Sequence, residues 1–479
     1  MRMNNYNSLV AACLAGLAAL PSTTTWAGAL DMNRNLIIIN KTFPADKYIL
    51  DQACVMIELY HCMDEHQFLL YDPEAPEVVF GKVSVRNLSS KPAEDSIMRT
   101  MAALKLRIHM LIETPEDEWD VDQKTLRKLF PTTWTEAEIS ASADRMINRG
   151  GMRRSFRVSL ENSSRYQQLM DSAFRAEGIP TRLKYLAHVE SRFNPEAVSG
   201  AGAAGIWQLL KGTSSPYLVI DDRVDQRMDP RDASQAAAKF LKHCHRNLAS
   251  WPLAIMAYNN GPAQMRDAVK ETGSLDASQI IQNYQGGGFG NLSRNYYAMF
   301  LAASSLAMKA ESLYPSLRKQ APIRFKTLKL EHEWTPRQLR ILSGYSTLVI
   351  MHYNPALRPI VFDRNLLVPK GFKLKLPAGL PTRQDQQFAD LRLAIAVSAR
   401  EASSAGRSLA GFPVPRFAEN TLRHIRKALF PFRRDDAGVM AYMHSQGLLE
   451  VDRLALAKQD RILIEPHPAL QATIRGMGG

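Results

Sequence analysis

The sequence is poor in cysteine and lacks long hydrophobic runs. Only four of its 479 residues are cysteine, and no apolar stretch reaches the 18 residues at which a helix begins to span a membrane. Three cysteines, Cys54, Cys62 and Cys244, lie beyond the N-terminal segment, and an odd number argues against a disulfide framework. Cys54 and Cys62 are also about 12 Å apart along a predicted helix over Tyr48–Met63, which is too far for a bridge. Hydrophobic residues at 46% and charged residues at 22% fit a packed globular protein.

The sequence also lacks zinc-finger spacing and any compact run of lysine or arginine, although its formal net charge is +13. These absences argue against nucleic acid as a partner, and screened attraction to another polyanion or to an acidic membrane surface accounts for the charge equally well. His243-Cys244-His245 resembles a metal cluster in composition. Adjacent residues of a helix point in different directions, so a structural role is favoured there, and no metal or cofactor is predicted.

The N-terminus has the layout of a secretory signal peptide. Arg2 precedes a mostly apolar run over Leu9–Leu20, and small residues follow from Ala27 on. This pattern predicts export with residues 1–27 as the signal, and a buried N-terminal helix is the alternative. Cys13 lies in a box that resembles a lipidation site, but it comes too early in the apolar run, so lipid anchoring is the less favoured interpretation.

Most of the chain has the periodicity of α-helices. Residues 28–155 are mostly helical in pattern and carry no chemical motif, and residues 156–310 form a second block that is α throughout. The clearest helix of the first block is Ser96–Glu113, which has an apolar stripe. The stripe consists of Ile97, Met101, Leu104, Ile108 and Leu111. The predicted fold class is therefore mainly α.

The pattern changes after residue 321. Residues 322–377 follow the order strand, helix, helix, strand, which predicts a small α+β unit. Residues 378–415 combine a helix with a linker that contains glycine, proline and serine, and residues 416–467 carry a weaker copy of the same order. We therefore expect a helical N-terminal region, a helical central domain and two small C-terminal units.

The segment Leu183–Ser191 places a glutamate on an apolar helix face. Glu190 shares one side of the predicted helix with the apolar residues before it. Those residues are Leu183, Leu186 and Ala187. A carboxyl in apolar surroundings loses hydration, which raises its pKa and lets it hold a proton near neutral pH for donation to a leaving oxygen. A solvated glutamate at a helix end is the alternative.

Two later segments have the composition of a sugar-binding site. Ser199–Gly205 is rich in glycine and alanine, so a flat substrate could approach its backbone. Trp207 and Gln208 follow with a large apolar face and an amide, and Tyr258 and Asn259 place a phenol and an amide at a helix end. Aromatic faces suit pyranose rings, and amides suit hydroxyl and acetamido groups.

Four motifs in order resemble the soluble lytic transglycosylase domain. They are Glu190-Ser191, Ser199, Gly205-Ile206-Trp207-Gln208 and Ala257-Tyr258-Asn259. The surrounding residues, over about 157–308, resemble one branch of that family, the membrane-bound lytic murein transglycosylases of type D. Each motif alone is weak, whereas four in order at suitable separations are specific. Ile206 stands where the family usually has leucine, which is a mild departure.

The resemblance implies a goose-lysozyme-like helical domain that cleaves the β-1,4 bond between N-acetylmuramic acid and N-acetylglucosamine in peptidoglycan. The family leaves 1,6-anhydromuramic ends and uses no water. Glu190 matches the family's single acid, which protonates the bridging oxygen and then, as carboxylate, takes the proton of the attacking muramic O6 hydroxyl. A second carboxylate, which most glycosidases require, is therefore not needed. The expected substrate-binding residues are Ser199, Trp207, Gln208, Tyr258, Asn259 and Tyr296.

Two assignments stay open at this level. Tyr296 matches a tyrosine that points at the acid, but the adjacent Tyr297 or a plain core role is the alternative. Asp221, Asp222 and Asp225 are the candidates for a second carboxylate, and they lie in an acidic turn that is expected to face solvent.

The unit over residues 322–377 resembles a LysM module, which binds N-acetylglucosamine chains, and 416–467 resembles a degenerate one. A packing subdomain without sugar affinity is the alternative for both. The implied partner is the peptidoglycan glycan strand and the implied location is the periplasm; association with the outer membrane is left open, and protein partners are unknown. A lysozyme-like hydrolase and a non-catalytic wall-binding protein are the alternative functions.

Overall fold

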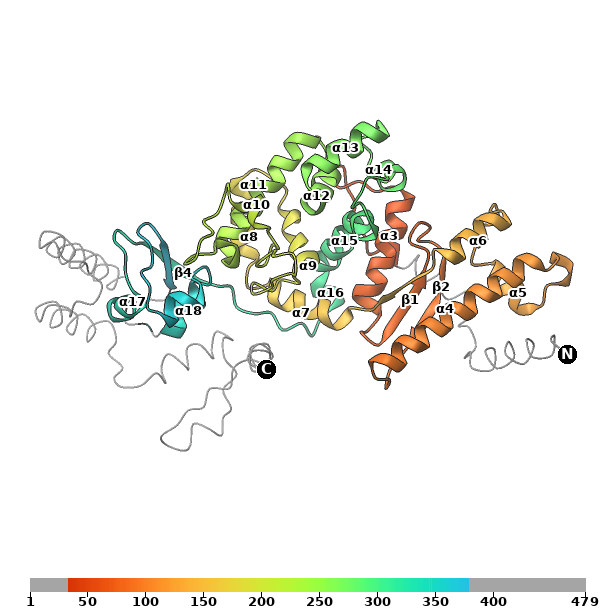
Figure 1. Cartoon of the computed structure of the whole chain (residues 1–479), viewed down its shortest axis with the longest axis horizontal. Helices are drawn as coiled ribbons and strands as arrows, with labels where there is room; N and C mark the ends of the chain where they lie inside the picture. Colours follow the sequence, from red (N-terminus) through yellow and green to blue (C-terminus); the bar gives the residue numbers. More distant parts are fainter. Residues whose placement is uncertain (1–32, 344, 346, 379–479) are drawn as a thin grey trace, which may run out of the picture. The chain divides into compact units, whose positions relative to one another are not determined.

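A computed structural model describes residues 33–343, 345 and 347–378 of the protein (Figure 1). The chain divides into two compact units, each made of segments that are distant in the sequence. Unit 1 takes the residues up to Ser163, Leu169–Asn194 and Ser234–Arg318, and unit 2 takes Ser164–Gln168, Pro195–Ala233 and the residues from Lys319 on. The expected signal peptide over 1–27, the helix and linker after residue 378 and the second small unit over 416–467 lie outside the described residues.

A three-stranded antiparallel sheet lies in the N-terminal part of unit 1. Strand β1 (Gln67–Tyr71) is central, between β2 (Val79–Ser84) and β3 (Ile147–Gly150). This sheet corrects the prediction of a helical region over 28–155, which is in fact mixed α and β. The strands have only four to six residues, too few to display a clear period, and β3 pairs with a strand far away in the sequence.

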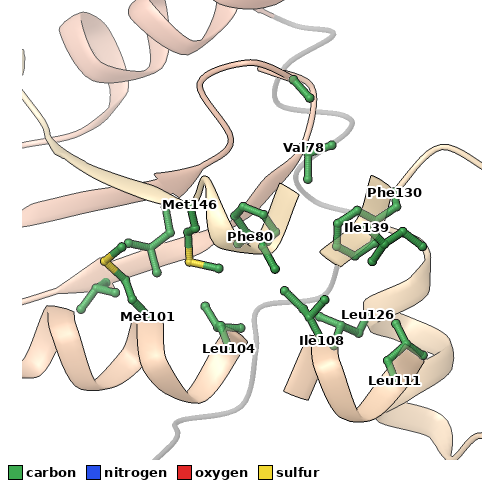
Figure 2. Close-up of a cluster of buried hydrophobic side chains, with 14 of the residues drawn as sticks. Val78, Phe80, Met101, Leu104, Ile108, Leu111, Leu126, Phe130, Ile139 and Met146 are labelled. Atoms are coloured by element: carbon green, nitrogen blue, oxygen red, sulfur yellow. The ribbon is translucent and has the colours of Figure 1, made fainter. Parts of the chain in front are cut away.

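The long helix α4 (Ser90–Glu113) packs against β2 through the predicted apolar stripe, which is confirmed. All five residues of that stripe are buried in one hydrophobic cluster, in which Phe80 and Phe130 are the large aromatic residues (Figure 2). Three short helices follow α4: η2 (Glu116–Glu118), α5 (Val121–Arg127) and α6 (Glu136–Asp144). Capping boxes at Asp120 and Thr135 begin α5 and α6, and each side-chain cap typically adds about 1 kcal/mol.

Helix α3 joins this N-terminal part to the central block within unit 1. α3 (Lys47–Ile57) continues as one turn of π-helix, η1 (Glu58–Cys62), and packs along α15 (Asn291–Met308). The Tyr297 hydroxyl of α15 donates a hydrogen bond of 2.8 Å to the backbone oxygen of Pro44, just before α3. The N-terminal part is therefore packed onto the helix that follows the predicted sugar-binding segments.

The central block is helical, and the mainly α fold is confirmed. Regular β-structure there is limited to isolated bridges within the described residues. Its helices are α7 (Arg153–Ser163), α8 (Gln167–Ala176), η3 (Thr181–Tyr185), α9 (Leu186–Glu190), α11 (Pro230–Leu248), α12 (Trp251–Asn260), α13 (Pro262–Thr272), α14 (Ala277–Asn283), α15 and α16 (Ala310–Leu313).

Unit 2 combines loops of the central block with the small α+β unit. The segment Pro195–Ala233 contains α10 (Lys211–Ser214) and η4 (Gln226–Met228). The α+β unit contains β4 (Phe325–Lys329), α17 (Pro336–Ser343), α18 (Thr347–Tyr353), α19 (Pro359–Asp363) and β5 (Lys373–Pro377). The predicted order of strand, helix, helix, strand is present, with α19 as an addition. β4 and β5 pair antiparallel, so that Thr327 lies opposite Lys375.

The described part of the chain contains three cysteines without a disulfide, and it contains no metal cluster. Cys54 and Cys244 are buried and Cys62 is exposed, and none of them forms a disulfide. Across residues 33–343, 345 and 347–378, no group of three or more histidine, cysteine or acidic side chains could hold a metal ion. Among these residues, no helix has both the length and the hydropathy needed to cross a membrane.

Candidate active site

The segment that leads to Glu190 is a 3-10 turn followed by one α-helical turn. Sequence analysis predicts one regular helix here, but η3 carries Thr181–Tyr185 and α9 only begins at Leu186. The apolar residues before the acid are nevertheless fully buried, as expected. They are Leu183, Leu186 and Ala187. Pro180 precedes the 3-10 turn. Although the turn is wound more tightly than an α-helix, the apolar side chains before Glu190 still face the protein interior.

The chain leaves α9 through two consecutive residues in the left-handed region. Arg192 has φ of 55° and Phe193 has φ of 56°, values that are rare for residues other than glycine. The Phe193 ring is fully buried and lies 4.4 Å from the ring of His188, centroid to centroid. The Phe193 amide donates to the backbone oxygen of Ala187. This anchored turn fixes the end of the helix at the acid, and such local strain is often found at functional sites.

Glu190 is a half-buried residue whose carboxyl has a phenol as its hydrogen-bond partner. The Tyr296 hydroxyl donates to Oε1 of Glu190. Burial raises the pKa of Glu190 to about 7, while the hydrogen bond from Tyr296 acts in the opposite direction. A carboxyl with this pKa can donate and accept a proton at neutral pH, which is what general acid and base catalysis requires.

The two adjacent tyrosines of α15 have different partners. Tyr296 points to Glu190, whereas Tyr297 donates to Pro44 near α3. Adjacent positions on a helix point about 100° apart, so only one of the two can face the acid. The structure selects Tyr296 of the two candidates.

Helix α12 ends beside the acid with a tyrosine and two asparagines. Burial raises the pKa of Tyr258 well above its usual value, and the negative charge of Glu190 raises it further. Asn259 is exposed. Asn260 accepts a hydrogen bond of 2.5 Å from Ser293 and donates to Met256, so it ties α12 to α15. Tyr258 therefore lies near Glu190, Asn259 is accessible at the end of α12, and Asn260 has a structural role.

Ser199 and Gln208 belong to a tightly hydrogen-bonded loop in unit 2. The Ser199 hydroxyl accepts from the amide of Ala203 at 3.0 Å. The Gln208 side-chain amide donates to the backbone oxygens of Ala197 and Gly205, at 3.0 and 2.9 Å. Both side chains are half-buried, and both hold the shape of the loop.

Glycine is required at position 205 of this loop. Gly205 has φ of 75°, and a Cβ atom there would lie 1.9 Å from the backbone oxygen of Arg227. Any larger residue would push the two segments apart.

Trp207 is completely buried, with 0% of its surface exposed. This burial corrects the prediction that its ring offers an apolar face to a sugar, because a stacking face has to be accessible. The residues on either side, Ile206 and Gln208, are buried and half-buried. Trp207 therefore supports the loop from inside the protein.

The three aspartates that were candidates for a second carboxylate have separate roles. Asp221 and Asp222 are exposed, as expected, and Asp221 accepts from the amides of Arg223 and Val224 within its own turn. Asp225 is buried, which corrects the expectation that it faces solvent, and it forms an ion pair of 2.8 Å with Arg227. Its carboxylate is thus committed to a structural pair.

Tyr60 is a buried residue near Tyr296, the hydrogen-bond partner of Glu190, and no motif in the sequence indicates it. It lies in the π-helical turn η1, is buried, and stacks on Phe156 with ring centroids 4.9 Å apart. It is close enough to Tyr296 to contribute to raising the pKa of that phenol. The N-terminal region therefore contributes to the surroundings of the acid, and no motif in residues 28–155 could have revealed this.

Comparisons with known proteins point to one domain family. Residues 170–281 match the family model of the Transglycosylase SLT domain. Membrane-bound lytic murein transglycosylase D of Escherichia coli (strain K12) is 33% identical over 107 residues, which cover 22% of this chain and 24% of that protein. A putative tributyltin chloride resistance protein of Alteromonas sp. (strain M-1) is 32% identical over 93 residues, covering 19% of this chain and 45% of that protein.

Among solved structures, an inactive mutant of lytic transglycosylase Slt from Pseudomonas aeruginosa matches at 17% identity with a TM-score of 0.26, covering 47% of this chain and 34% of that one. The alignment with the Escherichia coli protein covers about a quarter of that relative's length. Residues 170–281, with Glu190 and Tyr258 among them, match the Transglycosylase SLT domain family, and this part of the chain is similar to lytic transglycosylases.

Proposed function

We propose that the chain is a peptidoglycan lytic transglycosylase that cleaves the β-1,4 bond between N-acetylmuramic acid and N-acetylglucosamine. The observation that carries this proposal is the desolvated carboxyl of Glu190, with its pKa raised to about 7 and the Tyr296 hydroxyl donating to it. The Transglycosylase SLT domain over residues 170–281 and the similarity to lytic murein transglycosylase D support peptidoglycan as the substrate.

Glu190 performs both proton transfers of the reaction. It first gives its proton to the bridging oxygen, and the bond between that oxygen and C1 of the muramic residue breaks with its electron pair on the oxygen. The resulting carboxylate then takes the proton of the muramic O6 hydroxyl while O6 bonds to C1. The acid is regenerated, no water is consumed, and the product ends in a 1,6-anhydromuramic residue. One carboxyl is enough, because the internal hydroxyl replaces the water or second carboxylate of other glycosidases.

Tyr296, Tyr258, Asn259, Ser199 and Gln208 assist this reaction. The Tyr296 hydrogen bond stabilises the carboxylate that exists between the two proton transfers. Asn259 is exposed at the end of α12, where its amide can meet an acetamido or hydroxyl group. Ser199 and Gln208 shape the glycine-rich loop and present its backbone to the glycan.

The remaining expectations follow from this activity. We propose that residues 1–27 direct export, that the enzyme works in the periplasm, and that the unit over 322–377 is LysM-like and assists binding to glycan strands. The goose-lysozyme-like form of the catalytic domain, its extent over 156–310 and an association with the outer membrane belong to the same proposal.

Fragment analysis of purified sacculi tests the proposal. The wild-type protein is expected to release muropeptides with anhydromuramic ends, which are lighter by one water than reducing ends. Glu190→Gln is expected to release none, because the amide cannot donate or take up the proton. Glu271→Gln is the matched control, since Glu271 is an exposed residue of α13. Release of reducing ends instead would replace the proposal by the hydrolase. Equal binding by wild type and Glu190→Gln without release by either would replace it by the wall-binding protein.

A further inference from the structure

We propose that the small α+β unit holds the glycine-rich loop Ser199–Leu209 of the SLT domain in place, with Lys375 and Arg358 as positioning residues. The unit is here defined as residues 325–377. Every contact in this argument lies within unit 2. The inference rests on the proposed function for its kinetic consequence, whereas the structural coupling can be measured without any activity.

The first connection is a buried ion pair between β5 and the start of α11. Lys375 Nζ lies 2.6 Å from Oδ2 of Asp229 and 3.3 Å from Oδ2 of Asp232. The side chains of Lys375 and Asp229 are only 4% and 2% exposed. Asp229 also accepts from the amides of Arg231 and Asp232, so it caps α11. A charge that is almost fully buried needs its partner, so this pair fixes β5 against the first turn of an SLT-domain helix.

The second connection is a pair of backbone hydrogen bonds. The amide of Asp225 donates to the backbone oxygen of Ala356 at 2.7 Å, and the amide of Arg358 donates to the backbone oxygen of Arg223 at 2.9 Å. Val224, between them, is buried in the hydrophobic core of the α+β unit. The segment 223–225 of the SLT domain is thus bound to the α+β unit by backbone hydrogen bonds and by the buried side chain of Val224.

The Asp225 carboxylate binds both Arg358 of the α+β unit and Arg227 of the SLT domain. Nη2 of Arg358 lies 3.2 Å from Oδ2 of Asp225, and its Nε donates to the backbone oxygen of Asp221 at 2.7 Å. Arg227 binds both oxygens of Asp225, with Nε to Oδ1 at 2.9 Å and Nη2 to Oδ2 at 2.8 Å. The Asp225 carboxylate therefore joins one arginine of each segment, and the forked geometry fixes the orientation of the Arg227 guanidinium.

Arg227 in turn holds the glycine-rich loop. Its Nη1 donates to the backbone oxygen of Gly202 at 2.8 Å and to that of Leu209 at 3.1 Å, near the two ends of the tight turn. The backbone oxygen of Arg227 fills the space beside Gly205 that a Cβ atom would need. The loop that carries Ser199 and Gln208 is therefore held by Arg227, which is connected to the α+β unit through Asp225.

This arrangement differs from a wall-binding module on a flexible tether. A tethered module changes how the enzyme reaches long strands and leaves the cleavage of short ones unaffected. A unit that supports the loop affects the cleavage of glycans of every length, because the loop carries Ser199 and Gln208, which are proposed to assist the reaction.

Kinetics on short soluble glycan fragments test the consequence. Lys375→Met and Arg358→Gln are each expected to raise KM about fivefold or more relative to wild type, since misplaced substrate contacts weaken binding. The alkaline limb of the pH profile, which Glu190 sets, is expected to stay in place. Lys373→Met is the matched control on the same strand, because Lys373 is exposed, and it should leave KM within about twofold. A loss of folded protein alone would lower the apparent kcat and leave KM unchanged.

Hydrogen exchange tests the coupling itself. The amides of Ala204 and Leu209 are hydrogen-bonded within the loop, and the amide of Gly205 donates to Ala197 just before it. All three are expected to exchange at least about tenfold faster in Lys375→Met and Arg358→Gln than in Lys373→Met. If Lys375→Met does not fold, the exchange rates of Arg358→Gln test the coupling. This variant is expected to fold because the Arg358 side chain is 39% exposed.

Unchanged loop exchange and unchanged KM in folded Arg358→Gln would overturn the inference. If exchange rises but the wild-type protein releases no fragments, the coupling stands and the proposed function fails. If the wild type cleaves and neither variant differs from it, the proposed function stands and the coupling fails.

Discussion

Glu190 combines two properties that a surface carboxyl does not have together. Its surroundings are dry enough to raise its pKa to about 7, and the Tyr296 hydroxyl donates a hydrogen bond that stabilises the carboxylate when it forms. Desolvation favours the protonated form, and the hydrogen bond favours the carboxylate. The balance between the two puts the pKa of the carboxyl in the neutral range, so the same group can donate a proton and then accept one.

The raised pKa predicts that Glu190→Gln stabilises the protein at neutral and alkaline pH. In wild type, the folded-state pKa of about 7 exceeds the unfolded value of 4.5, so stability is full below pH 4.5 and falls as the pH rises through 7. The difference between the two pKa values corresponds to a loss of at most about 3 kcal/mol of unfolding free energy at pH 8. The neutral glutamine should recover much of this. Thermal unfolding at pH 5 and pH 8 measures it, and a Tm gain of equal size at both values would contradict the prediction.

Tyr296→Phe is predicted to move the alkaline limb of activity to higher pH. The Tyr296 hydrogen bond lowers the pKa of Glu190, so its removal lets burial raise that pKa further. The carboxylate also loses its donor, and kcat is expected to fall about 10- to 100-fold. A pH profile of kcat/KM measures both effects.

Tyr297→Phe is the matched control for that prediction. The variant loses the hydrogen bond to Pro44 and about 1 kcal/mol of stability, but it should keep the wild-type pH profile. A shift of the limb in both variants would indicate that α15 had moved as a whole.

The helices show where periodicity is reliable. The stripe of α4 appears in the structure residue for residue, because a helix of 24 residues repeats its apolar pattern several times. The shorter elements do not repeat enough to be recognised. The segment before Glu190 forms a 3-10 turn instead of a regular helix. The short strands of the N-terminal sheet lie between helices in the sequence and could not be recognised from their pattern.

The buried stripe of α4 predicts a large difference between two leucines of one helix. Leu104 is 1% exposed and lies in the hydrophobic cluster, whereas Leu106 is 42% exposed. Leu104→Ala is expected to lower the unfolding free energy by about 2–5 kcal/mol. Leu106→Ala is expected to change it by no more than about 0.5 kcal/mol. Urea unfolding followed by the fluorescence of Trp119 and Trp134, which pack against the cluster, measures the difference. Equal losses would mean that α4 is not packed as described.

On the scale of the molecule, the compact units do not follow the order of the sequence. The SLT-domain residues 170–281 contribute to both units: the acid and α12 belong to unit 1, and the glycine-rich loop belongs to unit 2. Unit 1 also takes in the N-terminal region, and unit 2 takes in the α+β unit. Regions that the sequence presents as separate domains are therefore packed with different parts of the SLT domain.

The net charge of +13 predicts that binding to sacculi depends on salt. Peptidoglycan carries carboxylates on its stem peptides, and screening shortens the range of their attraction as ionic strength rises. Retention of Glu190→Gln on sacculi is expected to fall steadily between about 0.05 and 0.5 M salt. A pull-down across that range measures it, with added N-acetylglucosamine oligomers as a neutral competitor. Retention that ignores salt but yields to the competitor would assign binding to sugar contacts alone.

The sequence by itself indicated Glu190 as the candidate acid, and it displayed the order of the motifs, the helical character of the central block and the strand–helix–helix–strand order of residues 322–377. These depend on local spacing and on short motifs, which a linear chain displays directly. Only the tertiary structure decided that Tyr296 rather than Tyr297 meets Glu190, that Trp207 is buried, and that Asp225 is bound by arginines. Each of these depends on which residues from distant segments come together, and burial and pairing are properties of that packing.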